Sequence, residues 1–154
     1  MPSQFKLSDY DETIRMVLES GGGFRMFPRG ISMLPLIVQQ RDSVVLIKPK
    51  GDLKKNDIAF YLRDDGHYVL HRVMKAENGK YSMCGDNQHW LEEGIENRHI
   101  IGVVSRINRK DKVITDDTLS YRIYLFVWQS FILRRVFFKF RGLFRKLRRL
   151  KNGS

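Results

Sequence analysis

The sequence has almost none of the residues that hold small folds together through covalent or metal bonds. Cys84 is the only cysteine among 154 residues, so no disulfide can form within the chain. A single cysteine suits a reducing compartment without excluding export. The four histidines lie in separate segments and lack the spacing of a zinc site. We therefore expect no metal and no cofactor, and a core formed by the 42% of residues that are apolar.

Long apolar runs are also missing. A membrane-spanning helix needs about 20 apolar residues, whereas the most apolar stretch, residues 123–133, is much shorter than that. A cleavable signal peptide would begin with a basic stretch followed by an apolar run. The first thirty residues instead contain Asp9, Asp11, Glu12 and Glu19. We expect neither a cleavable signal peptide nor a transmembrane helix.

Acidic residues are absent from the end of the chain. Residues 121–154 contain ten Lys and Arg and no Asp or Glu, although the whole chain carries a net charge of +11. The first 120 residues hold the other eighteen basic residues against all seventeen acids, so they are close to neutral. Any partner attracted by positive charge is therefore expected to bind the C-terminal tail, residues 116–154.

The tail has the pattern of an amphipathic helix. From residue 131 onward its apolar residues recur in steps of three and four, with the basic residues largely between them. Such a helix favours a membrane surface that carries anionic lipid, which would place the protein on the cytoplasmic side. Packing on the body or on a partner is the alternative, and nucleic acid is not expected, because a phenylalanine stripe indicates burial rather than base stacking. The expected membrane-contacting residues are Trp128, Arg134, Arg135, Phe137, Phe140, Arg141, Phe144 and Arg145.

The rest of the chain predicts one helix and then a series of short strands. Residues 8–19 read as a helix with Ser8 as N-cap, ended by a run of three glycines. Asp64-Asp65-Gly66 and Asn78-Gly79 are typical of hairpin turns. Strands without intervening helices predict a mainly β fold, an antiparallel, coiled, barrel-like sheet. The expected strands are 44–47, 58–62, 68–73, 80–84 and 100–107.

A candidate nucleophile lies in the segment Gly30-Ile31-Ser32-Met33-Leu34-Pro35. Ser32 stands between a glycine and a proline, where regular helix is excluded. A nucleophilic serine needs a hydroxyl on a rigid turn and a nearby backbone N–H for the oxyanion. Taken alone, a serine in this setting is more often an ordinary turn residue.

Two later segments strengthen the case. Tyr68 to Val73 predicts a strand in which His71 points to the opposite face from its neighbours Leu70 and Arg72. Gly85-Asp86-Asn87 then follows the next expected strand. Arg72 is expected to be a structural ion-pair partner rather than a catalytic group.

Gly-x-Ser-Met-x-Pro, His-Arg-Val and Gly-Asp-Asn, in this order over residues 24–107, resemble the signal peptidase and LexA-type serine peptidases, specifically their serine–histidine branch. The resemblance implies Ser32 as nucleophile and His71 as general base, where many relatives use lysine. It implies Asp86 as the third member, with Glu92 as the alternative. Gly30, Ile31, Met33 and Pro35 are implied in substrate or oxyanion contacts, although many relatives carry a hydroxyl where this chain has Gly30.

The sequence therefore predicts a serine endopeptidase that cleaves a leader or signal-like peptide, with activity rising between about pH 5.5 and 7.5 as His71 deprotonates. Two alternatives stay open: a binding module with weak or lost turnover and a self-cleaving LexA-like regulator, disfavoured by the short segment before Gly30. The expected domains are an N-terminal helix and linker over 1–23, a peptidase domain over 24–115 and the tail over 116–154. The sequence leaves the oligomeric state open.

Overall fold

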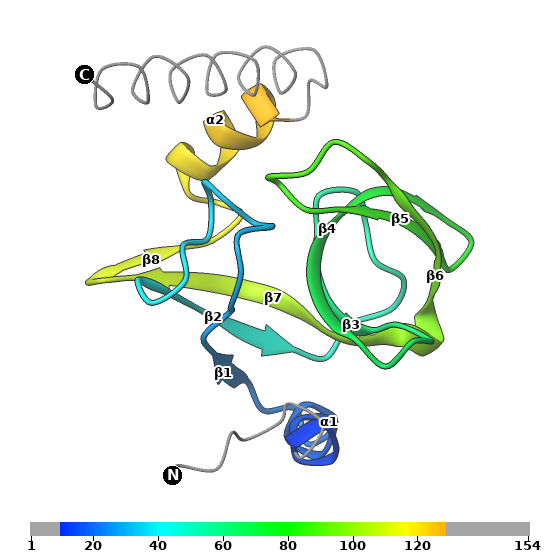
Figure 1. Ribbon diagram of the computed structural model, residues 1–154. Helices are drawn as coiled ribbons and strands as arrows, with labels where there is room; N and C mark the ends of the chain where they lie inside the picture. The colour runs from blue at the N-terminus through cyan, green and yellow to red at the C-terminus, as the bar shows by residue number, and fades with distance from the viewer. Residues whose placement is uncertain (1–9, 129–154) are drawn as a thin grey trace, which may run out of the picture. The chain divides into compact units, whose positions relative to one another are not determined.

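The computed structural model describes residues 10–128 and has a mainly β fold (Figure 1). The chain divides into two compact units, residues 1–116 and residues 117–154. The first unit contains α1 (Asp11–Glu19), β1 (Phe24–Met26), β2 (Asp42–Ile47), β3 (Ile58–Leu62), β4 (Tyr68–Glu77), β5 (Lys80–Cys84), β6 (Glu92–Glu96), the short 3₁₀ helix η2 (Asn97–His99), β7 (Ile100–Arg109) and β8 (Lys112–Ile114). The second unit contains α2 (Leu119–Trp128). The expected division at residues 23 and 115 stays a prediction.

The eight strands form one antiparallel sheet in the order β1-β2-β7-β3-β4-β5-β6, with β8 added on β7. This confirms the predicted antiparallel, mainly β fold. Strands β3 to β6 curl strongly in Figure 1. Among the described strands, no pairing joins β1 to β6, so the coiled sheet stays open and does not close into a barrel.

The curled half of the sheet surrounds a compact apolar cluster. β3 is buried over most of its length because it lies between β7 and β4. Its Ala59 pairs with His71 on β4, and this register brings the two strands' site residues together. The cluster consists of Leu53, Ala59, Tyr61, Val73, Tyr81, Met83 and Ile95. The site described below is therefore built on the packed part of the sheet.

The predicted helix and hairpins are confirmed with adjusted ends. α1 begins at Asp11 and buries Ile14 and Leu18, while the expected N-cap Ser8 lies outside the described residues. The β4–β5 turn places Asn78 and Gly79 at φ of 49° and 72°, the left-handed backbone that was expected there. The expected strands all form, and β4 continues to Glu77.

Three strands were not predicted: β1, β6 and β8. β6 has the sequence Glu-Glu-Gly-Ile-Glu, whose intrinsic strand preference is low. It forms because it pairs with β5, where Tyr81 lies opposite Ile95. This strand positions a carboxylate of the candidate site.

Candidate active site

The Ser32 loop connects β1 to β2 and is irregular, as the glycine and proline require. Gly30 has φ of +93°, which a residue with a side chain rarely adopts, and its N–H donates to Gln39 Oε1 at 2.9 Å. The Leu34–Pro35 peptide bond is cis. The loop is further closed by a hydrogen bond from the Ile37 N–H to the Met33 carbonyl at 2.9 Å. Ser32 thus lies on a defined turn.

The Gly85-Asp86-Asn87 segment is hydrogen-bonded to this turn. The Asn87 N–H donates to the Ser32 carbonyl at 2.7 Å, and Asn87 Nδ2 donates to the Ile31 carbonyl at 3.0 Å. A Cβ at Gly85 would lie 2.6 Å from the Ser32 carbonyl oxygen, which is closer than atoms of this kind approach. Glycine and asparagine in this motif therefore set the position of the backbone that carries Ser32.

Asp86 has a structural partner of its own. Both of its carboxylate oxygens accept hydrogen bonds from Arg72, at 2.8 and 2.7 Å. The two side chains are almost completely buried, with 2% of Arg72 and none of Asp86 exposed. A paired buried charge of this kind is costly to break. The expectation that Arg72 is an ion-pair partner fits this arrangement.

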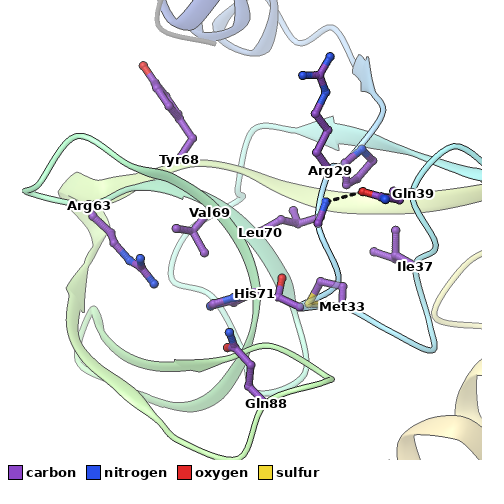
Figure 2. A pocket seen from close by; sticks show the side chains of 13 residues that line it. Arg29, Met33, Ile37, Gln39, Arg63, Tyr68, Val69, Leu70, His71 and Gln88 are labelled. Atoms are coloured by element: carbon purple, nitrogen blue, oxygen red, sulfur yellow. Dashed lines mark hydrogen bonds between the residues drawn. The ribbon is translucent and has the colours of Figure 1, made fainter. Parts of the chain in front are cut away.

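Ser32 and His71 line the same pocket, which has a volume of about 250 Å³ (Figure 2). Met33, Leu70 and Gln88 also contribute to its wall. The Ser32 hydroxyl makes no hydrogen bond to His71 in this structure. Within residues 10–128, the hydroxyl and the Nε2 atom of His71 each have no hydrogen-bond partner. Catalytic hydrogen bonds are often formed only when substrate closes the site.

The other ring nitrogen of His71 is engaged. Its Nδ1 lies 3.1 Å from the Tyr61 hydroxyl and 3.6 Å from Glu92 Oε2. Only 4% of His71 is exposed. Burial lowers the pKa of His71 to about 4, and the negative charge of Glu92 offsets only part of this effect. The imidazole is therefore neutral over the physiological pH range and loses its proton at a lower pH than the sequence-based expectation of 5.5–7.5.

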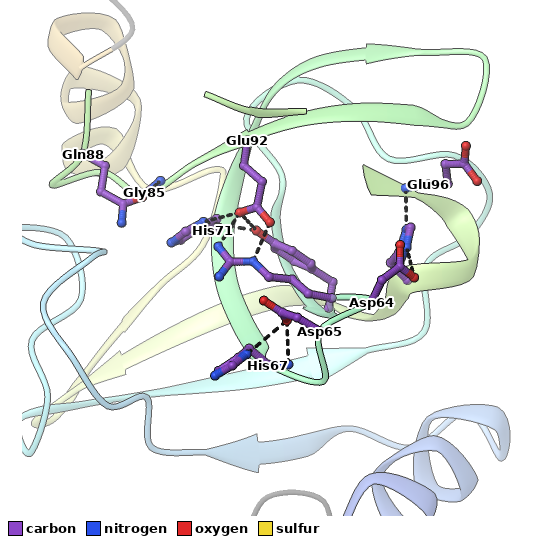
Figure 3. Close-up of polar contacts among 11 residues, drawn as sticks. Asp64, Asp65, His67, His71, Gly85, Gln88, Glu92 and Glu96 are labelled. Atoms are coloured by element: carbon purple, nitrogen blue, oxygen red, sulfur yellow. Dashed lines mark hydrogen bonds and ion pairs between the residues drawn. The ribbon is translucent and has the colours of Figure 1, made fainter. Parts of the chain in front are cut away.

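Glu92 is held by Arg63 and Tyr61, and Figure 3 shows it beside His71. Arg63 donates to its two oxygens at 2.5 and 2.6 Å, and the Tyr61 hydroxyl donates to Oε2 at 2.7 Å. Burial acts to raise the pKa of Glu92, but the hydrogen bonds from Arg63 and Tyr61 outweigh it and the pKa is lowered. The side chain at the imidazole is thus an ionised carboxylate.

The preference for Asp86 over Glu92 as the acid at His71 is not the arrangement found. Asp86 binds Arg72, whereas Glu92 faces Nδ1 of the imidazole. The reason is the alternation of β4: successive side chains point to opposite faces of the sheet, so a carboxylate that pairs with Arg72 belongs to the other face from His71. A catalytic role for these residues stays a prediction.

The residues expected near the substrate have different environments. Gly30 and Met33 line the pocket, and Met33 is buried. Ile31 is 61% exposed, and Pro35 lies on the surface of the loop. The Ser32 N–H, which the family resemblance implies as the oxyanion donor, has no acceptor within the described part of the chain.

Sequence reasoning missed Tyr61, Arg63 and Gln88. Tyr61 read as an ordinary strand aromatic, because its neighbours Phe60 and Leu62 are apolar. Its role depends on the β3–β4 register and on β6, which no local pattern indicated. A tyrosine on the strand paired with the His71 strand was the available signal.

Most of the expected membrane-contacting residues, from Arg134 to Arg145, lie outside the described residues. Trp128 ends α2, where its ring stacks on Tyr124 at 5.3 Å between centroids. Over residues 10–128, no helix combines the length and apolar character needed to cross a bilayer. In the same range, no group of three or more His, Cys, Asp or Glu side chains is arranged to hold a metal ion.

The comparison with protein families agrees with this architecture. The family model described as Peptidase S24-like matches residues 5–105, about two thirds of the chain. The protein therefore belongs to the Peptidase S24-like family, as the resemblance to LexA-type peptidases indicated. No curated protein matches the chain. The matched range contains the Ser32 loop, β4, the Gly85 motif and Glu92.

Proposed function

We propose that this S24-like protein is a serine endopeptidase of the signal-peptidase type, in which Ser32 is the nucleophile and His71 the general base. The observation that carries the proposal is that Ser32 and a buried, neutral His71 line one pocket, each with its reactive atom unpartnered within the described residues. A serine hydroxyl is a weak nucleophile until a base accepts its proton, and a neutral imidazole is suited to that role.

The proposed reaction follows from these positions. The Ser32 O–H bond breaks as its proton moves to His71 Nε2, and Oγ forms a bond to the peptide carbonyl carbon. The imidazolium then gives the proton to the amine nitrogen as the C–N bond breaks, which leaves an acyl-serine that water hydrolyses. Because Glu92 is ionised near Nδ1, it favours the transient imidazolium.

The oxyanion is proposed to bind the Ser32 N–H. Gly30 contributes no hydroxyl, and its own N–H is already bound to Gln39. An oxyanion site with one fewer donor lowers turnover by about 10²- to 10³-fold in well-studied hydrolases. We therefore expect slow cleavage, which suits an enzyme that processes few substrates.

The substrate is proposed to be a leader or signal-like peptide presented at a membrane surface. The support is the basic, apolar pattern of the tail, together with the exposed apolar residues Ile123 and Phe126 on α2. Anionic headgroups attract each Lys or Arg by about 1 kcal/mol, so ten basic residues suffice to hold a soluble domain at a membrane.

The test compares peptides from cells that make the wild-type protein or Ser32→Ala, by mass spectrometry. The proposal expects one or a few cleavages to vanish in the variant, and the same loss in His71→Ala. Ser43→Ala, which removes a serine hydroxyl outside the pocket, is the matched control and should retain every cleavage. Unchanged peptides in Ser32→Ala would support a binding module instead, and a lost cleavage within this chain itself would support the self-cleaving regulator.

A further inference from the structure

Tyr61 stands between the candidate base and its carboxylate. Its hydroxyl oxygen lies 3.1 Å from His71 Nδ1 and 2.7 Å from Glu92 Oε2, whereas the carboxylate itself is 3.6 Å from Nδ1. The tyrosine is completely buried within the apolar cluster of the sheet, so its ring has little freedom to leave this position. The nearest polar group to Nδ1 of the imidazole is therefore the Tyr61 hydroxyl, and the Glu92 carboxylate lies farther away.

The direction of each hydrogen bond follows from the single proton of the phenol. Burial and the neighbouring Glu92 raise the pKa of Tyr61, so the phenol stays protonated. The ionised carboxylate is the stronger acceptor, and Tyr61 donates to it. The Tyr61 oxygen is then left as an acceptor, and the Nδ1–H of His71 is the donor that reaches it.

We infer that Tyr61 is a positioning residue that fixes His71 as its Nδ1–H tautomer and leaves Nε2 unprotonated on the pocket side. The tautomer of a histidine is set by the hydrogen bond that its other nitrogen makes. The assignment of the tautomer depends only on the fold, while its catalytic consequence rests on the proposed function.

Arg63 completes the arrangement. Its two hydrogen bonds anchor Glu92, which orients the phenol, and its positive charge acts to lower the pKa of His71. The resting imidazole is thereby kept neutral although a carboxylate lies nearby. When Nε2 accepts the serine proton, Nδ1–H keeps its bond to Tyr61, and no proton needs to pass to the tyrosine or to Glu92.

Nitrogen-15 NMR of the histidine rings at pH 7 tests the inference directly, since the two neutral tautomers have different ring-nitrogen shifts. The His71 signals are assigned by their loss in His71→Asn. We expect the wild-type protein to show the Nδ1–H tautomer and Tyr61→Phe to shift toward Nε2–H, because Glu92 at 3.6 Å is too far to replace the phenol. Tyr81→Phe removes another buried hydroxyl, which is bonded to Leu53 and Asn97, and should leave the tautomer unchanged.

Kinetics give the second measurement. With a peptide that the wild-type protein cleaves as substrate, Tyr61→Phe should lower kcat about tenfold or more. KM should change little, because the substitution disturbs the base rather than substrate binding. Tyr81→Phe should retain the wild-type kcat. Equal kcat values in the two variants would contradict a positioning role for Tyr61.

The outcomes separate this inference from the proposed function. A wild-type protein that shows the Nδ1–H tautomer but cleaves nothing would overturn the enzyme and leave the tautomer assignment intact. A wild-type His71 in the Nε2–H form would overturn the role of Tyr61 even in an active peptidase. The wild-type spectrum alone decides the second point, so the test does not depend on the folding of Tyr61→Phe.

Discussion

The buried position of His71 makes the stability of the fold depend on pH in a defined window. In the unfolded chain the imidazole titrates near its ordinary value of 6.5, whereas burial lowers the folded-state pKa to about 4. Between these values the unfolded state binds more protons, so acid favours unfolding. The contribution of the buried, neutral His71 to the unfolding free energy is fully present above pH 6.5. It is lost as the pH falls from 6.5 through about 4.

The size of the effect follows from the same two values. At about 1.4 kcal/mol per unit of pKa, the fall from 6.5 to about 4 corresponds to about 3 kcal/mol of unfolding free energy, most of it lost by pH 4.5. Only 4% of His71 is exposed, so solvent screening removes little of this energy. The loss is a large part of the 5–15 kcal/mol that typically stabilises a domain.

The experiment is urea unfolding of the wild-type protein and His71→Asn at pH 7.5 and pH 4.5. The asparagine amide keeps a donor near the Tyr61 hydroxyl but has no titrating ring, so the variant should lose about 2–3 kcal/mol less than wild type over this range. Packing defects and the carboxylates that titrate in both proteins cancel in the comparison. His67→Asn, which removes a ring that is mostly in water, is the control and should follow the wild type. Equal losses in all three proteins would refute the burial argument.

Three further predictions concern the site. Asp86→Asn should destabilise the fold by about 3 kcal/mol or more in thermal or urea unfolding, because it leaves the buried Arg72 without its charged partner. Gly85→Ala should cost about 1–3 kcal/mol and lower peptide cleavage, because its methyl group would displace the Ser32 carbonyl. The kcat/KM of peptide cleavage should rise with pH around 4 and be flat from about 5.5 to 7.5, since His71 is neutral there.

The controls for these predictions lie on the β3–β4 turn. Asp65→Asn changes an exposed carboxylate and should leave the stability close to that of the wild type. Gly66→Ala meets no neighbouring atom but has φ of +82°, so it should cost about 1 kcal/mol and keep full cleavage activity. An Asp86→Asn protein as stable as Asp65→Asn, or activity lost equally in the two alanine variants, would contradict the roles assigned above. A cleavage profile that rises near pH 6.5 would contradict the low pKa of His71.

Local patterns were sufficient for the parts of the fold that local chemistry determines. Alternating and β-branched residues predicted β2, β3, β4, β5 and β7, and Asn78-Gly79 predicted its hairpin because few other pairs tolerate left-handed backbone. The edge strands β1, β6 and β8 were missed because they are short or polar. Such strands form through pairing with a neighbour rather than through their own preference.

The same distinction explains the site. Ser32, His71 and the Gly85 motif were found because the three motifs occur together in the order of a known peptidase family, although each is common alone. Local patterns could not show which carboxylate lies nearest His71, because the choice between Asp86 and Glu92 depends on which face of the sheet each reaches. Glu92 lies on β6, a strand that the sequence did not predict, and its link to His71 passes through Tyr61, a residue with an ordinary appearance in β3.

Two successive residues of β4 connect the two halves of the candidate site. His71 points to the pocket, while Arg72 on the opposite face binds Asp86. Asp86 lies between Gly85 and Asn87, the residues that fix the Ser32 backbone, so the ion pair ties the loop of the nucleophile to the strand of the base. The position of Ser32 relative to His71 therefore depends on this ion pair and on the hydrogen bonds from Asn87 to the loop. The His-Arg and Gly-Asp-Asn motifs therefore act together to position the candidate site. The buried arginine holds the loop through Asp86, and the histidine lines the pocket.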